Sequence, residues 1–298
     1  MDIVSSLGLT NFVMQFSRIS MYPFFDMAHY TLAIMSLKEQ SGAVDVAHRS
    51  PIACWFSGML CCFGGSILAS LLLGEPPIES FTNNRNIILA SVIWYLIFYC
   101  PYDKFYKCCN FLPSKLFIAG MKEVTRARKI VGGVMDAHSR YRNGWLAMIA
   151  VGWAKGAGSG LLSNFEQLVR GVWMPEKNQL LKMPYATKVS LIGAVLFTLQ
   201  EMNYLPMTRH NLIFLYTMFV VSTKVAMVLF QIHHSPFAPM EAALYNMAFS
   251  WQSYSADPHF NTPEPCDKGE PLDDQCTASS GATSDETDVR KRKTKKAD

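Results

Sequence analysis

The 298-residue chain has little charge for its length. Asp, Glu, Lys and Arg together make up 17% of the residues, whereas about 25% is usual for a soluble globular chain. Half of the residues are hydrophobic. A sequence with so few charges and so many apolar side chains is typical of a membrane protein.

Signals for secretion, metal binding and catalysis are also missing. The opening residues, MDIVSSLGLTNFVMQF, have no basic n-region and no small-residue cleavage site, so we expect the N-terminus to be retained. The eight cysteines form neither a disulfide framework nor a CxxC metal motif, and we expect reduced thiols and no metal site. Because no nucleophile and base stand in a known motif and no glycine-rich phosphate loop is present, we expect no catalytic residues and no enzyme.

Long apolar segments are abundant. A helix that crosses a bilayer needs about 20 predominantly apolar residues. Seven segments approach this length: Phe16–Leu37, Ile52–Leu73, Ile87–Cys100, residues 111–134, Trp145–Leu162, Val189–Gln200 and Leu212–Gln231. We therefore predict an all-α membrane protein with seven transmembrane helices.

The distribution of Lys and Arg between the segments predicts the orientation. Basic residues favour the cytoplasmic side, and they are more frequent in residues 38–50, 102–115 and 164–188 than in the alternate loops. This bias places residues 1–15 on the non-cytoplasmic side and the C-terminus in the cytoplasm.

The C-terminal residues 253–298 differ in composition from the rest. They are rich in Pro, Asp, Thr, Ser and Gly, which predicts a disordered cytoplasmic tail. Its basic end RKRKTKK either contacts anionic lipid or is solvated. Lys295 and Lys296 in the terminal KKAD resemble a dilysine retrieval signal of the endoplasmic reticulum.

Two glycine-rich stretches suggest an internal repeat. FGGSILASLL from Phe63 aligns without gaps with AGSGLLSNFE from Ala157, so that Gly64 meets Gly158. We expect two inverted three-helix repeats, residues 16–110 and 111–205, followed by a seventh helix in residues 206–252, as in transport proteins. Gly64, Gly65 and Gly158 either allow two helices to approach closely or bend and unwind them at a permeation site.

The fourth segment contains the charged stretch KEVTRARK, residues 122–129. Lys115, Lys122, Arg126 and Lys129 form one stripe on a helix. At about 2.5 to 3.5 kcal/mol for each central basic residue, three or four of them facing lipid would cost roughly 10 kcal/mol. The stripe must therefore face protein, water or an anionic ligand, unless the helix begins later.

Three interpretations of the stripe are open. KEVTRARK could be an interfacial segment with snorkelling side chains that precedes the helix. Lys122 and Arg126 could hold a phosphoinositide head group near the cytoplasmic leaflet. Lys129, which lies deeper, could respond to membrane voltage in an aqueous cavity.

Other charges lie inside apolar segments. Asp26 follows Pro23 near the middle of the first segment, and it is either functional or a structural partner of Lys129 or Lys155. Lys155, in WAKGAGSG, is expected to face the same interior. We expect His29 to be a packing histidine.

Four of these stretches, KEVTRARK, HYTLAIMSLKEQ, FGGSI and WAKGAGSG, resemble the trimeric intracellular cation channels, and the resemblance extends to about Tyr254. Within that family the chain is most similar to the A-type branch of the sarcoplasmic and endoplasmic reticulum. The resemblance implies a homotrimer with one pore in each protomer, permeation of K⁺, and a location in those membranes, with the nuclear envelope as a further one.

The resemblance also implies a role and a ligand. The role is counter-ion flux during calcium release and uptake, in functional coupling with calcium-release channels. The ligand is phosphatidylinositol 4,5-bisphosphate, bound through Lys122 and Arg126 with Gly158 near the lipid. Lys129, Asp26 and Lys155 are then the pore candidates, together with Gly64 and Gly65. A secondary transporter built on the inverted repeat is the alternative function, and a seven-helix receptor is a third class.

Overall fold

The structure is a computed structural model that describes residues 10–172, 183–230, 243, 246 and 247. Contacts divide the chain into two units, Met1–Asn246 and Met247–Asp298, and nearly all of the described residues belong to the first. The expected disordered tail and its retrieval signal, Lys295 and Lys296, lie outside the described residues.

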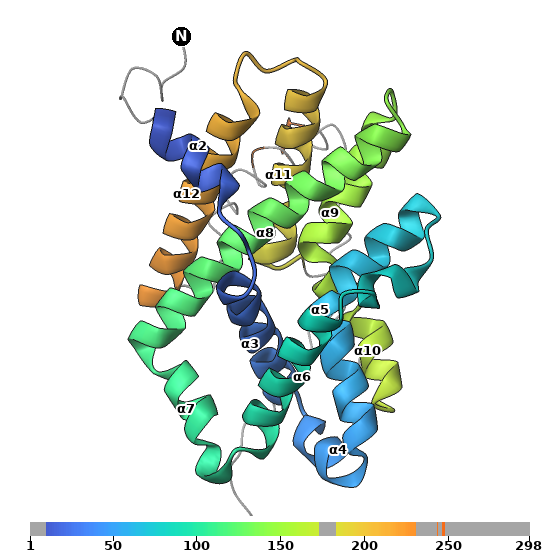
Figure 1. Ribbon diagram of the computed structural model, residues 1–298, viewed down its shortest axis with the longest axis vertical. Coiled ribbons are helices and arrows are strands. Elements are labelled where there is room, and N and C mark those ends of the chain that lie inside the picture. Colours follow the sequence, from blue (N-terminus) through green and yellow to red (C-terminus); the bar gives the residue numbers. More distant parts are fainter. Residues whose placement is uncertain (1–9, 173–182, 231–242, 244–245, 248–298) are drawn as a thin grey trace, which may run out of the picture. The chain divides into compact units, whose positions relative to one another are not determined.

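All regular structure in the described part of the chain is helical (Figure 1). The helices are α2 (Thr10–Arg18), α3 (Phe24–Lys38), α4 (Ala43–Arg49), α5 (Pro51–Leu73), α6 (Asn84–Tyr99), α7 (Lys104–Asn110), α8 (Leu112–Arg140), α9 (Trp145–Leu161), α10 (Ser163–Val169), α11 (Tyr185–Glu201) and α12 (Arg209–Leu229), with 3₁₀ turns η1 (Pro77–Phe81) and η2 (Pro101–Asp103). Each of the seven predicted segments overlaps one of the longer helices.

Proline and glycine explain several helix ends. The prediction of one helix over Phe16–Leu37 is wrong, because α2 ends at Arg18 and α3 begins only after Pro23, which has no N–H to continue a helix. Pro51 lies in the first turn of α5, and Gly74 ends this helix with a left-handed φ of 70°.

Length and apolar composition identify fewer spans than seven. Within the described residues, α5 and α12 are each long and apolar enough to cross a membrane, and α6 with residues 101–110 is a third if this pair, bent by 96°, counts as one span. Helix α8 is long but highly charged, and α9 and α11 have 17 residues each.

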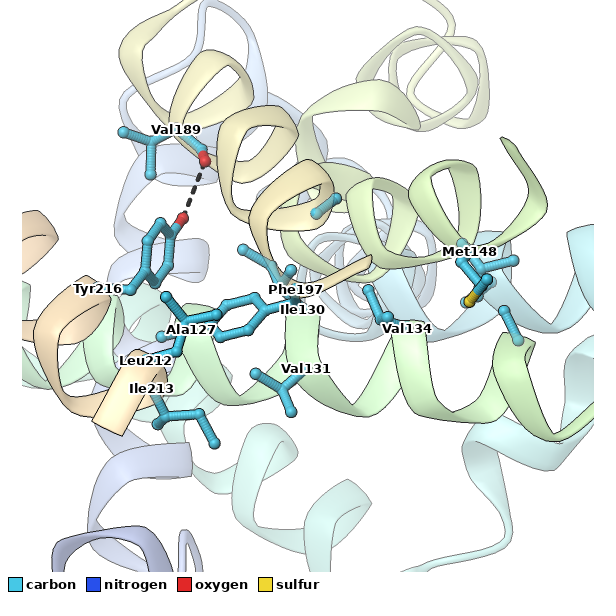
Figure 2. Packing of buried hydrophobic residues seen from close by; sticks show 14 of the residues in the cluster. Ala127, Ile130, Val131, Val134, Met148, Val189, Phe197, Leu212, Ile213 and Tyr216 are labelled. Carbon is cyan, nitrogen blue, oxygen red and sulfur yellow. Dashed lines mark hydrogen bonds between the residues drawn. The ribbon is translucent and has the colours of Figure 1, made fainter. Parts of the chain in front are cut away.

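Two hydrophobic clusters hold the helices together. The larger one joins α8, α9, α11 and α12 with the end of α5, and Figure 2 shows Phe197 and Tyr216 at its centre. Their rings meet edge to face at 5.2 Å, and the Tyr216 hydroxyl donates a hydrogen bond of 2.8 Å to the Val189 carbonyl. The smaller cluster joins α3, α5 and α6, with Met59 and Ile97 fully buried.

Helices α5 and α9 cross at the two glycine-rich stretches. A Cβ atom on Gly65 would lie 2.6 Å from the Lys155 carbonyl oxygen, and one on Gly158 would lie 2.3 Å from the Gly65 Cα. Both helices continue through these glycines without interruption. The interpretation that the glycines unwind the helices is therefore wrong for this structure, and they allow close approach of two backbones instead.

Candidate functional site

Helix α8 carries the charged stripe and lies among four other helices. It contacts α9, α12, α3 and α11, and Figure 1 shows it crossing beside α2 and α12. The helix already begins at Leu112, before KEVTRARK. The interpretation of this stretch as an interfacial segment preceding the helix is therefore wrong, and the stripe faces protein.

Arg126, one of the charges of this stripe, is neutralised by Glu123 of the same helix. The Glu123 side chain is 2% exposed and the Arg126 side chain 10%, and Arg126 Nη1 donates to Glu123 Oε2. A buried carboxylate without such a partner would be strongly destabilising. Arg126 thus has one glutamate partner on its own helix and is still free to direct other N–H groups elsewhere.

Lys122 and Arg126 line an open pocket of about 230 Å³ whose walls come from six helices or their ends. The remaining walls come from α3 and its end (Ala33, Ser36, Gln40), α5 (Cys61), α9 (Gly156, Ala157, Ser159, Gly160), α10 (Ser163, Glu166) and the start of α11 (Pro184, Ala186, Thr187). The small residues of α9 are what leave the space. Gly158 itself lies on the α5 side of α9 and is not part of the lining.

Two polar groups of this pocket lack partners. Among the described residues, Lys122 takes part in no ion pair within 4.0 Å. The Ser163 hydroxyl oxygen is buried and, within the same part of the chain, has no hydrogen-bond partner. A buried ammonium and a buried hydroxyl both gain from an anionic acceptor, because unpaired polar groups in a protein interior are costly.

Glu166, on the opposite wall, belongs to a second buried ion pair. Arg170 Nε lies 2.5 Å from Glu166 Oε1, and Arg170 Nη2 lies 3.1 Å from Glu166 Oε2. The same guanidinium donates to Gln40 Oε1 and to the Ser41 carbonyl oxygen at 3.3 Å. This network ties α10 to the end of α3 and fixes one wall of the pocket.

The sequence analysis missed this network. Arg170 lies in the predicted cytoplasmic loop 164–188. Glu166 and Arg170 are four residues apart, however, which is the spacing of a helical ion pair. That spacing could have indicated α10.

Lys129 lies farther along α8 and contacts α3. Its Nζ atom is 2.8 Å from His29 Nε2, and the same ring nitrogen is 3.2 Å from the Cys62 carbonyl oxygen of α5. His29 is thus a packing histidine whose ring nitrogen has hydrogen-bond partners, and it is the polar neighbour of Lys129. Sequence reasoning could not find this pair, because the two residues are 100 positions apart.

Lys155 and Asp26 have different surroundings from those predicted. Lys155 Nζ pairs with the Asp136 carboxylate at the far end of α8. In the described part of the chain, Asp26 forms no ion pair within 4.0 Å with any residue, Lys129 and Lys155 included. Asp26 is thus not the direct partner of either lysine, although it is near enough to Lys129 to act on it through space.

One more interior cation was overlooked. Lys224 lies in the apolar helix α12, with its ammonium 5.9 Å from the centre of the Tyr185 ring. It is electrostatically coupled to Glu123 and Arg126 across the α8–α12 contact. A single lysine inside a long apolar run was the available signal.

Comparison with known proteins identifies the family. The family profile described as TRIC channel matches residues 40–231. The chain belongs to the TRIC channel family. The trimeric intracellular cation channel type B-B of Xenopus laevis is 54% identical over 281 residues, which cover 94% of this chain and 99% of that protein.

Relatives of both types match. The type A channel of Oryctolagus cuniculus is 48% identical over 301 residues, with 100% of both chains covered. A solved structure of TRIC counter-ion channels, described as a basis for activity in calcium release, has a TM-score of 0.73 and 61% identity, covering 75% of this chain and 100% of that one.

The family assignment confirms two predictions. The resemblance to trimeric intracellular cation channels is correct, and TRIC channels are ion channels and not enzymes.

Proposed function

We propose that this chain is a monovalent cation channel, chiefly for K⁺, that supplies counter-ion current across the sarcoplasmic and endoplasmic reticulum membrane during calcium release and uptake. The relatives are named trimeric intracellular cation channels, and one solved structure concerns counter-ion channels in calcium release. By the same argument the chain assembles as a homotrimer and works alongside calcium-release channels.

The proposed topology has seven spanning helices, two inverted three-helix repeats and α12, with a cytoplasmic C-terminus. The crossing of α5 and α9 at Gly65 and Gly158 supports the repeat, because the aligned stretches of the two halves meet there. The loop distribution of Lys and Arg supports the orientation.

The observation that carries the proposed site is the pocket formed by Lys122, Arg126 and Ser163. It combines an ammonium that forms no ion pair among the described residues, a guanidinium, and a buried hydroxyl without a partner in that same part of the chain. Phosphate oxygens accept charge-assisted hydrogen bonds from all three. We assign this pocket to the phosphorylated head group of phosphatidylinositol 4,5-bisphosphate.

We place the pore next to this pocket, at the part of α8 that carries Lys129. Lys155 is neutralised by Asp136, whereas Lys129 has a neutral partner, His29, so we assign to Lys129 the role of setting the local potential and responding to voltage. Asp26, whose carboxyl group interacts with Lys129 through space, is the acidic candidate of the pore. Gly64, Gly65 and Gly158 act by holding α5 and α9 in contact.

The test is a recording from purified protein in planar bilayers with K⁺ on both sides. We expect discrete unitary currents that depend on voltage and on phosphatidylinositol 4,5-bisphosphate in the bilayer. Saturable K⁺ flux without unitary events would contradict the channel and support the alternative, a secondary transporter.

A further inference from the structure

The imidazole of His29 has two partners that cannot both bond the same nitrogen. Lys129 Nζ and the Cys62 carbonyl oxygen lie 2.8 Å and 3.2 Å from His29 Nε2. A lysine ammonium only donates hydrogen bonds and a carbonyl oxygen only accepts them. His29 Nε2 therefore bonds Lys129 only while it carries no proton, and bonds Cys62 only while it carries one.

We propose that His29 is the positioning residue of the voltage-responsive Lys129, and that its Nε2 atom exchanges Lys129 for the Cys62 carbonyl when Lys129 moves. The inference rests on the proposed function, in which Lys129 is part of the pore. In one state His29 Nε2 accepts a hydrogen bond from Lys129. In the other state Lys129 has moved away, and Nε2 donates to the Cys62 carbonyl oxygen instead.

The packing around the ring favours an exchange without large movement. Ala28 and Tyr30, on either side of His29 in α3, are 3% exposed each, and the Tyr30 ring packs on Phe63 of α5 at 5.4 Å. The imidazole is thus held between α3 and α5, whereas Lys129 reaches it by a long flexible side chain. When Lys129 leaves, water takes the proton from Nδ1 and returns one to Nε2, so the neutral ring changes tautomer and bonds Cys62.

Each arrangement satisfies the groups that it buries. With Lys129 in place, the ammonium has a neutral acceptor and no second buried charge is needed. With Lys129 displaced, Nε2 donates to the second lone pair of the Cys62 carbonyl, so this nitrogen keeps a hydrogen-bond partner. Two discrete arrangements of this kind are what a voltage-driven switch requires.

The charges around the ring keep it neutral during the exchange. The charged groups facing His29 are Lys129, Lys122 and Arg126 of α8, and three positive charges beside one imidazole disfavour a fourth. A protonated His29 would carry N–H groups on both nitrogens, so it could not accept from Lys129 and would repel it. The exchange therefore takes place between the two tautomers of the neutral ring.

The test compares voltage dependence in planar bilayers for His29→Leu and His29→Gln. Leucine is of similar size and has no acceptor, so we expect at least about a tenfold change in the ratio of open to closed channels at a fixed voltage, as for loss of a hydrogen bond to a charged group. Glutamine offers an amide oxygen to Lys129 and an amide N–H₂ to Cys62, so we expect it to restore near-wild-type voltage dependence.

Two further measurements separate positioning from a structural effect. In a Lys129→Gln background, His29→Leu should change voltage dependence no further, since the partner is gone. His48→Gln, which changes an exposed histidine, should behave as wild type. If His29→Leu does not yield a folded trimer, His29→Met, which is of similar length and also has no nitrogen or oxygen acceptor, takes its place.

The outcomes that overturn the inference differ from those that overturn the proposed function. Normal voltage dependence of folded His29→Leu, an equal effect of this change with and without Lys129, or a His29→Gln variant that behaves like His29→Leu would each overturn the role of His29. Normal voltage dependence of Lys129→Gln would instead overturn the proposed role of Lys129 itself.

Discussion

Gly65 of α5 and Gly158 of α9 are in backbone contact, so close that a Cβ atom on Gly158 would lie 2.3 Å from the Gly65 Cα. These two glycines come from stretches that align with each other in the sequence. Their contact joins the half of the chain that holds α3, α5 and α6 to the half that holds the charged helix α8 through α9.

The first prediction concerns this contact. Gly158→Ala should lower the free energy of unfolding by at least about 1 to 3 kcal/mol, because the new methyl group meets backbone that cannot move aside. The measurement is thermal stability in detergent, followed by size-exclusion chromatography. Gly120→Ala on α8 is the matched control, since its Cβ would meet only the Val221 side chain at 3.7 Å; equal stability of the two variants would contradict the prediction.

The second prediction concerns the pocket. Lys122→Gln should reduce co-purified phosphatidylinositol 4,5-bisphosphate by about tenfold, because one charge-assisted hydrogen bond to phosphate is lost. Mass spectrometry of the lipid extract measures this. Lys104→Gln, which changes an exposed lysine of α7, is expected to retain the lipid.

Arg126 needs a paired design, because Arg126→Gln would leave Glu123 buried without its partner. The double change Glu123→Gln and Arg126→Gln removes both charges and keeps an amide pair. We expect this variant to fold and to lose the lipid; a folded double variant that retains the lipid at the wild-type level would show that the head group lies elsewhere.

The third prediction concerns the buried Glu166–Arg170 network. Arg170→Met should lower the free energy of unfolding by about 3 to 5 kcal/mol, because it leaves the Glu166 carboxylate buried without a positive partner. Adding Glu166→Gln should recover part of this loss. Arg140→Gln is the control, since its ion pair with Glu75 is largely exposed and should contribute only about 0 to 1 kcal/mol.

Failure of the third prediction has a clear form. If Arg170→Met and Arg140→Gln destabilise the protein equally in thermal unfolding, the network does not hold α10 against the end of α3. The same variants also report on the pocket, because Glu166 is part of its wall.

The fourth prediction concerns location. Replacing Lys295 and Lys296 by Ser should increase the fraction of protein at the cell surface, because a cytoplasmic dilysine signal returns proteins to the endoplasmic reticulum. Surface biotinylation measures that fraction. Ser at Lys291 and Lys293 alters the same basic cluster outside the terminal KKAD and serves as the control; equal retention of all forms would rule out the retrieval signal.

The sequence by itself determined the helical class, the positions of the long helices and the family. Apolar runs of sufficient length in a chain with few charges must bury their backbone polar groups in helices, and that requirement is local. The stripe of Lys122, Arg126 and Lys129 was predictable for the same reason, since side chains three and four residues apart share one face of a helix. Pro23 also indicates a local disturbance of the first segment, but in the structure the segment is divided into two helices there.

Only the tertiary structure decided what each charge meets. Lys129 and His29, Lys155 and Asp136, and Arg170 and Gln40 are separated by 100, 19 and 130 positions, and their contacts depend on how α3, α8, α9 and α10 pack. A charged side chain in a protein interior needs a partner. The sequence contains many possible partners of opposite charge, and it does not tell which of them will lie within reach. That choice comes from close packing, as at Gly65 and Gly158, because one added methyl group at that crossing would move α9, which carries Lys155 and packs on α8, away from α5.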